Sequence, residues 1–190
     1  MKRILALLLA GALLCTLTGC STAADGQTKH KSLVVYFSAT GNTKAVAQYI
    51  ADAAKATLFE LTPEQPYAEG DLDWNNPDSR VSAELASEEA QNAVVLTNIS
   101  VGDWESYDTI FIGYPIWWDL APRIIETFLE HSDLSGRPVI PFATSGGSGI
   151  EASERSLRAA YPQIDWKKGR LLNSFPDKAR IEQWLSGTQE

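Results

Sequence analysis

Residues 33–43 read LVVYFSATGNT, and this stretch decides the fold that we expect. Its first five residues are aliphatic or aromatic, which is typical of a strand buried on both faces of a sheet. The next six form a turn of small and hydroxyl-bearing residues with one glycine. Beyond the turn, Val46, Ala47 and Ile50 recur at helical spacing. The order strand, turn, helix predicts the first unit of a parallel α/β sheet.

The same alternation of short apolar runs and longer amphipathic stretches continues along the chain. Further strands are expected at residues 57–61, 109–113, 138–143 and 170–172, and helices at residues 122–130, 151–160 and 177–185. The connection over residues 62–107 is unusually long, and is either a lid or a crossover with a surface excursion. We expect a crossover helix within residues 79–91. The predicted fold class is α/β, with a three-layer, doubly wound, five-stranded parallel sheet.

The turn after the first strand is suited to binding a phosphate monoester. Ser38, Thr40, Asn42 and Thr43 offer side-chain donors, and the backbone amides that open the next helix add partial positive charge. The turn matches neither G-x-x-x-x-G-K-[ST], typical of triphosphate sites, nor G-x-G-x-x-G, typical of dinucleotide sites. An ordinary helix cap is the alternative interpretation.

Two later loops also follow predicted strand ends, at the edge where doubly wound sheets bind ligands. In residues 113–122, Trp117 and Trp118 are adjacent, so their side chains point apart and cannot both be core residues. Residues 144–149 form a glycine-rich turn, which lets the backbone approach a ligand closely. Neither serine in that turn has the G-x-S-x-G context of a hydrolase nucleophile.

These loops together resemble the flavodoxins. The turn at residues 38–43 is similar to their FMN phosphate loop, (Ser/Thr)-x-Thr-Gly-x-Thr, and residues 113–118 to a Gly-x-Pro-x-Trp-Trp stretch that packs against the flavin in one subgroup. The resemblance covers almost all of residues 33–185, although residues 62–107 contain no matching motif. It implies the strand order 2-1-3-4-5, FMN as cofactor, and a flavin ring contact from Trp117 or Trp118. The cofactor-binding residues that it implies are Ser38, Ala39, Thr40, Gly41, Asn42, Thr43, Pro115, Ile116, Trp117, Trp118, Thr144, Ser145, Gly146 and Gly147.

The first nineteen residues are expected to be a signal peptide. Lys2 and Arg3 precede an apolar run at residues 4–17, which is shorter than the ~20 residues that span a bilayer. The run ends in Leu17-Thr18-Gly19-Cys20, which looks like a bacterial lipobox; an ordinary signal peptide with an incidental cysteine is the alternative. The predicted organisation is a signal peptide at 1–19, a lipidated Cys20 opening a flexible tether at 20–32, and a flavodoxin-like domain at 33–186. The location implied is the extracytoplasmic face of a bacterial membrane.

Composition narrows the chemistry. The formal net charge is −8, and removing Lys2 and Arg3 would make it −10, which argues against a nucleic-acid partner. A lipidated Cys20 would leave the mature chain without a free thiol, and the two histidines, which lie far apart in the sequence, predict no metal site. We interpret Asp71, Asp73, Glu84, Glu88 and Glu89 as a solvated face. The four tryptophans interpreted as packing residues are Trp74, Trp104, Trp166 and Trp184.

The expected function is electron transfer by an FMN-binding flavoprotein. Its partners would be FMN, a redox protein or small electron acceptor, and the membrane through the lipid anchor. An FMN-dependent oxidoreductase linked to NAD(P)H or a quinone is the first alternative, and a non-catalytic flavodoxin-like binding module is the second. No twin-arginine pair precedes the apolar run, so the chain is expected to cross the membrane unfolded and to take up FMN outside.

Overall fold

The computed structural model describes residues 31–173 and 178–187. The predicted signal peptide, Cys20 and nearly all of the predicted tether lie outside the described residues. Among the described helices, none combines the length and the apolar character needed to cross a bilayer.

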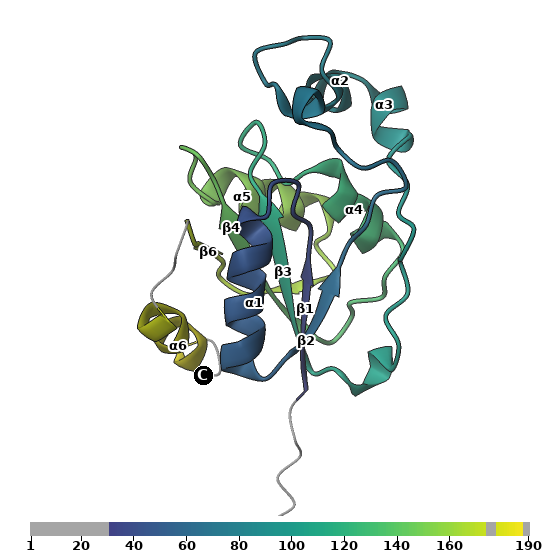
Figure 1. Ribbon diagram of the computed structural model, residues 1–190. Helices are drawn as coiled ribbons and strands as arrows, with labels where there is room; N and C mark the ends of the chain where they lie inside the picture. Colours follow the sequence, from purple (N-terminus) through teal and green to yellow (C-terminus); the bar gives the residue numbers. More distant parts are fainter. Residues whose placement is uncertain (1–30, 174–177, 188–190) are drawn as a thin grey trace, which may run out of the picture.

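The sheet is parallel and has the order β2-β1-β3-β4, with the fifth position shared by two short strands (Figure 1). The predicted order 2-1-3-4-5 is confirmed. The strands are β1 (Ser32–Tyr36), β2 (Thr57–Glu60), β3 (Thr109–Pro115), β4 (Pro138–Thr144), β5 (Asp165–Trp166) and β6 (Arg170–Leu171).

The fifth position of the sheet is interrupted between β5 and β6. The predicted strand at 170–172 corresponds to β6, and β5 was not predicted. Both β5 and β6 pair with β4, and the amides of Lys167 and Leu172 donate to the carbonyls of Val139 and Ala143, at 2.8 and 2.7 Å. A two-residue strand such as β5 has too few residues for a period-2 signal to be visible.

Pro141 of β4 explains the interruption. Alternate residues of a strand face the same neighbour, so Pro141 faces the fifth position together with Val139 and Ala143. Proline has no N–H to give to the ladder at that point. Gly169 lies against it, because a Cβ at Gly169 would come within 2.7 Å of the Pro141 carbonyl oxygen.

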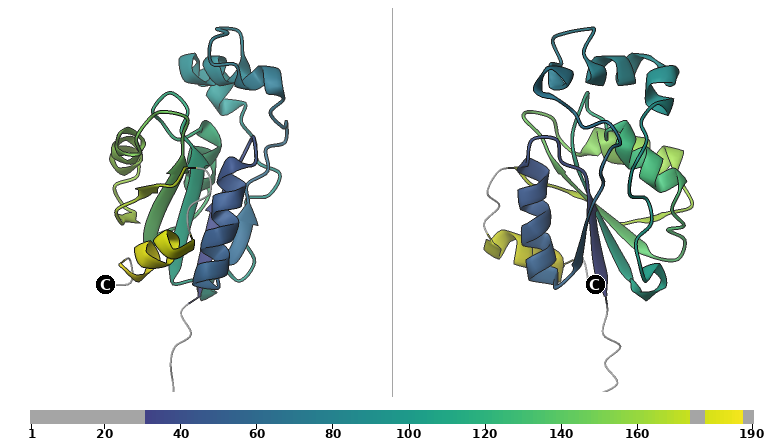
Figure 2. Two further views of the ribbon diagram at one scale, coloured as in Figure 1. Left: turned by 60° about the vertical axis from the view of Figure 1, so that its left-hand side comes forward. Right: turned by 45° about the vertical axis from the view of Figure 1, so that its right-hand side comes forward.

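Helices cover both faces of the sheet and make three layers. On one face lie α1 (Asn42–Ala54) and α6 (Lys178–Ser186), whose Ile50, Ile181 and Trp184 pack on one apolar cluster. On the other lie α4 (Arg123–Glu130) and α5 (Glu151–Ala160), in a second cluster. Figure 2 shows the two pairs on opposite sides of the strands. The predicted helices at 151–160, 122–130 and 177–185 are thus present, with small shifts at the ends of the last two.

The prediction of a single crossover helix is wrong. The connection forms a 3₁₀ turn η1 (Glu69–Leu72), two short helices, α2 (Arg80–Ala86) and α3 (Glu88–Asn92), and a second 3₁₀ turn η2 (Trp104–Ser106). Ser87 ends α2 and caps α3, since its Oγ accepts from the amide of Ala90. Figure 1 shows α2 and α3 above the carboxyl ends of the strands, away from the face of the sheet.

The part of the connection after α3, residues 94–107, covers the face of the sheet that a crossover helix would otherwise cover. Val94 and Tyr107 are buried in the cluster beneath α4, with Leu96, Val101 and Trp104 against it. Because extended chain covers this face, the helices before it are free to sit over the edge of the sheet. That placement brings the connection to the ligand-binding edge.

Candidate functional site

A cavity of about 900 Å³ opens at the carboxyl ends of the strands. All three loops expected from the sequence contribute to it, together with the long connection and Asn173, two residues after the end of β6. Its lining residues are Thr40, Asn42, Leu72, Trp74, Val81, Pro115, Ile116, Trp117, Trp118, Asp119, Thr144, Ser145, Gly146, Gly147, Ser148 and Asn173. The volume lies within the range of small-molecule and cofactor sites.

The first loop joins β1 to α1 and leaves the start of that helix open. Gly41 caps the helix with φ of +89°, a left-handed conformation that favours glycine, and no side chain caps it. Within the described ranges, the amides of Asn42, Thr43 and Lys44 have no protein acceptor. Unpaired amides at a helix start, with the exposed Thr40 hydroxyl beside them, suit an anion.

Four of the predicted site residues do not line the cavity. Ser38 accepts from the Gly41 amide at 3.1 Å and so shapes the turn, and Ala39 packs against the core. Gly41 sets the backbone direction, as described above. Thr43 is buried, and its hydroxyl is hydrogen-bonded to that of Thr144 at 2.8 Å. These four residues shape and support the first loop without lining the cavity.

Thr144 links all three loops. Its hydroxyl meets Thr43 of the first loop, and its carbonyl accepts from the Ile116 amide of the second at 2.8 Å. In the third loop, Ser145 Oγ accepts from the amides of Gly147 and Ser148, at 3.1 and 2.8 Å. The side chain of Asn173 accepts from the Ser145 amide at 2.8 Å. The loops are therefore held together before any ligand is present.

The second loop ends in a strained hairpin turn. Trp117 and Leu120 exchange two backbone hydrogen bonds, of 3.0 and 2.8 Å, around Trp118 and Asp119. Both central residues have positive φ, 54° and 62°, as in a type I′ turn that normally favours asparagine and glycine. Such conformations cost about 1–3 kcal/mol each in non-glycine residues and cluster at functional sites.

As the sequence predicts, the two tryptophans are not both core residues. Trp117 is partly buried and meets the Phe37 and Tyr67 rings edge-on, with centroids at 5.7 and 5.1 Å. Trp118 is 40% exposed. Both line the cavity, one as part of its wall and the other at its mouth.

The long connection closes the outer side of the cavity through Leu72, Trp74 and Val81. Trp74 is 65% exposed and meets Trp118 edge-on at 6.5 Å between centroids. The interpretation of Trp74 as a packing residue is therefore wrong, whereas Trp166 and Trp184 are buried and Trp104 packs on the core.

Comparison with known proteins establishes the family to which this fold and cavity belong. The Flavodoxin family model matches residues 31–188. The chain belongs to the flavodoxin family. A solved protein from Bacteroides uniformis, described as a flavoprotein, is 46% identical over 83% of this chain and 98% of that chain, with a TM-score of 0.76. A flavodoxin from Maridesulfovibrio salexigens is 25% identical over 170 residues, 83% of this chain and 95% of its own.

A more distant flavodoxin-like structure carries its ligand. A flavoprotein from Lactobacillus acidophilus, solved in complex with FMN, is 24% identical over 82% of this chain and 99% of that chain, with a TM-score of 0.59. At this identity the likeness shows the shared fold.

Three side chains connect α2 of this flavodoxin to the residues before it. The Tyr67 hydroxyl donates to both carboxylate oxygens of Glu84, at 3.0 and 2.9 Å, and Arg80 Nε donates to the same carboxylate at 2.7 Å. The Arg80 guanidinium also lies 3.8 Å from the Tyr67 ring centroid. Burial, reinforced by the charge of Glu84, raises the pKa of Tyr67 well above its usual range.

Glu84 therefore departs from the prediction of a solvated acidic face. It is only 7% exposed, and its charge is compensated by Arg80 and Tyr67. The sequence carried a usable signal, since Arg80 precedes Glu84 by four residues on a predicted helix.

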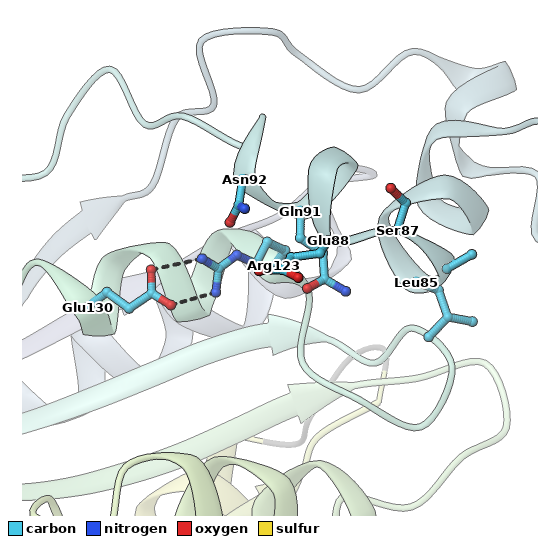
Figure 3. A pocket seen from close by; sticks show the side chains of 8 residues that line it. Leu85, Ser87, Glu88, Gln91, Asn92, Arg123 and Glu130 are labelled. Atoms are coloured by element: carbon cyan, nitrogen blue, oxygen red, sulfur yellow. Dashed lines mark hydrogen bonds and ion pairs between the residues drawn. The ribbon is translucent and has the colours of Figure 1, made fainter.

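A second, polar cavity of about 450 Å³ lies between α3 and α4 (Figure 3). Its centre is Arg123, which forks onto Glu130 with distances of 2.6 and 2.8 Å and also reaches Glu126. Glu88 and Gln91 of α3 line the opposite side. This arrangement fixes the start of α4, directly after the strained second loop.

The residues missed at the main cavity come from three places. Asp119 and Ser148 lie within the predicted loops at 113–122 and 144–149 but are not among the predicted cofactor-binding residues. Asn173 follows β6, so the rule that ligands bind at the carboxyl ends of strands could have found it. Leu72, Trp74 and Val81 carry no local signal, because only the path of the connection brings them to the cavity.

Proposed function

We propose that this chain binds FMN in the main cavity and acts as an electron-transfer flavoprotein. The observation that carries the proposal is the meeting of the three loops around one cavity, with the open start of α1 at one end and Trp117 and Trp118 at the other. Phosphate suits the first end and a flat apolar ring suits the second. The FMN complex of the Lactobacillus acidophilus relative supports the same cofactor.

The residues fit FMN in distinct ways. Thr40 and Asn42 would hold the phosphate through side chains, and Thr43 through its backbone amide, because its hydroxyl faces Thr144. Trp117 and Trp118 would contact the ring and exclude water from it. Backbone groups of the loop at 145–147 would meet the polar edge of the ring.

Bound FMN supplies a ring that takes up and releases electrons. The chain would tune this chemistry through charge, since a formal net charge of −8 resists a further negative charge on a bound group. Asp119 adds a carboxylate at the cavity itself. The effect would be to lower the potential of the second electron, which favours one-electron transfer.

The proposal includes a lipid tether at Cys20 and an extracytoplasmic location. In support, β1 begins at the edge of the sheet opposite the cavity (Figure 1), so a tether before it would leave the cavity uncovered. We expect Cys20→Ser to abolish incorporation of labelled fatty acid in a bacterial host and to release the domain from membranes. Labelling that persists in this variant would contradict the tether.

The binding proposal is tested by titrating residues 21–190 with FMN while following tryptophan and flavin fluorescence. We expect one FMN per chain, with mutual quenching because the indoles lie beside the ring. Quenching should weaken in Trp117→Phe or Trp118→Phe, whichever residue makes the main contact, and stay unchanged in Trp184→Phe, on the far side of the sheet. No saturable binding at high micromolar FMN would overturn the proposal and favour a non-catalytic module.

A further inference from the structure

We infer that residues 68–93 form a lid on the cavity, and that Tyr67, which packs on Phe37 and Trp117 at the strand ends, is the anchor to which Arg80 and Glu84 of the lid are held when it is closed over bound FMN. This inference rests on the proposed function, because it assigns a role in cofactor retention. Tyr67 acts here as a positioning residue.

The lid has defined hinges. Just before it, the Glu64 amide donates to the Val95 carbonyl at 2.8 Å, and the Thr97 amide donates to the Thr62 carbonyl at 2.9 Å. Pro63 and Leu96 pair in the same short antiparallel bridge. Both ends of the segment are therefore fixed to each other at one place, and the chain between them projects over the edge of the sheet (Figure 2).

Between the hinges, few residues bury apolar surface against the rest of the molecule. Most residues from 65 to 80 are exposed, and the buried apolar residue of α2 is Val81. Segments with few buried contacts open locally at low free-energy cost. The lid therefore depends on a small number of specific contacts.

Tyr67 makes the central one of these contacts. Its ring packs on Phe37, after β1, and on Trp117, after β3, with centroids at 5.5 and 5.1 Å. Its hydroxyl holds Glu84, on α2, and Arg80 stacks on its ring. Tyr67 thus joins α2 to the carboxyl ends of two strands.

Opening at this point would change two walls of the cavity together. Val81, next to Arg80, lines the cavity from the lid, and Trp117 lines it from the second loop. Leu72 and Trp74 of the lid close the outer side. A flat ring held between these walls has to pass the lid in order to leave.

The test compares FMN dissociation in the native chain and in Tyr67→Phe, measured by dilution into excess apo-flavodoxin from another source. The variant keeps the ring and loses the hydrogen bond to a charged, buried carboxylate, so we expect dissociation to be about tenfold faster. Amide hydrogen exchange in α2 of the FMN-free protein should accelerate by a similar factor, since opening no longer breaks that bond.

Tyr36→Phe is the matched control. Tyr36 is also buried and donates to a carboxylate, Glu60, which is paired with Lys44. It packs in the apolar cluster under α1, to which none of the described residues of the lid belongs. We expect this variant to leave exchange in α2 and the FMN dissociation rate unchanged.

Each outcome separates the inference from the proposed function. If the native chain binds FMN and Tyr67→Phe releases it at the native rate with unchanged exchange in α2, the anchor is refuted and the proposed function stands. If the native chain does not bind FMN, the proposed function and the retention role both fail. Faster release together with faster exchange, absent in Tyr36→Phe, supports the lid.

Discussion

Replacing Thr40 with glutamate is expected to weaken FMN binding at least a hundredfold. Thr40 is exposed and lines the cavity beside the open start of α1, so the new carboxylate would stand where the phosphate is proposed to bind. Placing like charges together costs several kcal/mol, and about 3 kcal/mol corresponds to roughly a hundredfold change in affinity. Isothermal titration with FMN measures the loss.

Folding should survive this substitution, because an acidic side chain before a helix interacts favourably with its dipole. In the control variant Thr40→Gln, the new side chain has nearly the same size as glutamate but no charge. This variant should retain most of the affinity for FMN. Riboflavin, which lacks the phosphate, should bind the native chain and Thr40→Glu with similar affinity. An equal loss for FMN and riboflavin would place the phosphate away from the start of α1.

Gly113→Ala is expected to lower the free energy of unfolding by about 3 kcal/mol or more, the upper range for overpacking a core. Gly113 lies in β3 opposite Phe142 of β4, and a Cβ at this position would come within 2.1 Å of the Phe142 ring. Phe142 is fully buried, so its ring cannot move aside without disturbing the layer beneath α1. Urea unfolding of the FMN-free protein measures the change.

Gly102→Ala is the control for the loss of a glycine. A Cβ at Gly102 meets nothing within 4 Å, and its backbone is not left-handed. We therefore expect a change of less than about 1 kcal/mol, in either direction. A mild effect of Gly113→Ala would mean that the strands separate more easily than the packing around Phe142 indicates. A combined Gly113→Ala/Phe142→Leu variant should recover part of the loss.

The local order of the chain was sufficient to predict the sheet and the three loops. Residues 33–43 placed β1, the hydroxyl-rich turn and α1 within about one residue, because a buried strand, a hydroxyl-rich turn and a helix each have a short-range pattern. Because ligands bind at the carboxyl ends of the strands in doubly wound sheets, the loops at 113–122 and 144–149 could also be predicted to lie at that edge. Ten of the fourteen predicted cofactor residues line the cavity, and the other four lie behind the first loop.

Other features depended on contacts between distant residues. Pro141 interrupts the fifth position because proline has no N–H to donate there, which becomes visible only when β4 and the chain around Gly169 are side by side. The roles of Trp74 and Glu84 follow from the path of residues 62–93 over the edge of the sheet. Periodicity reports which face of an element is apolar, whereas the direction in which a long connection leaves the sheet is decided by packing. The sequence alone therefore determined the family fold and its three loops, and the tertiary structure decided what covers them.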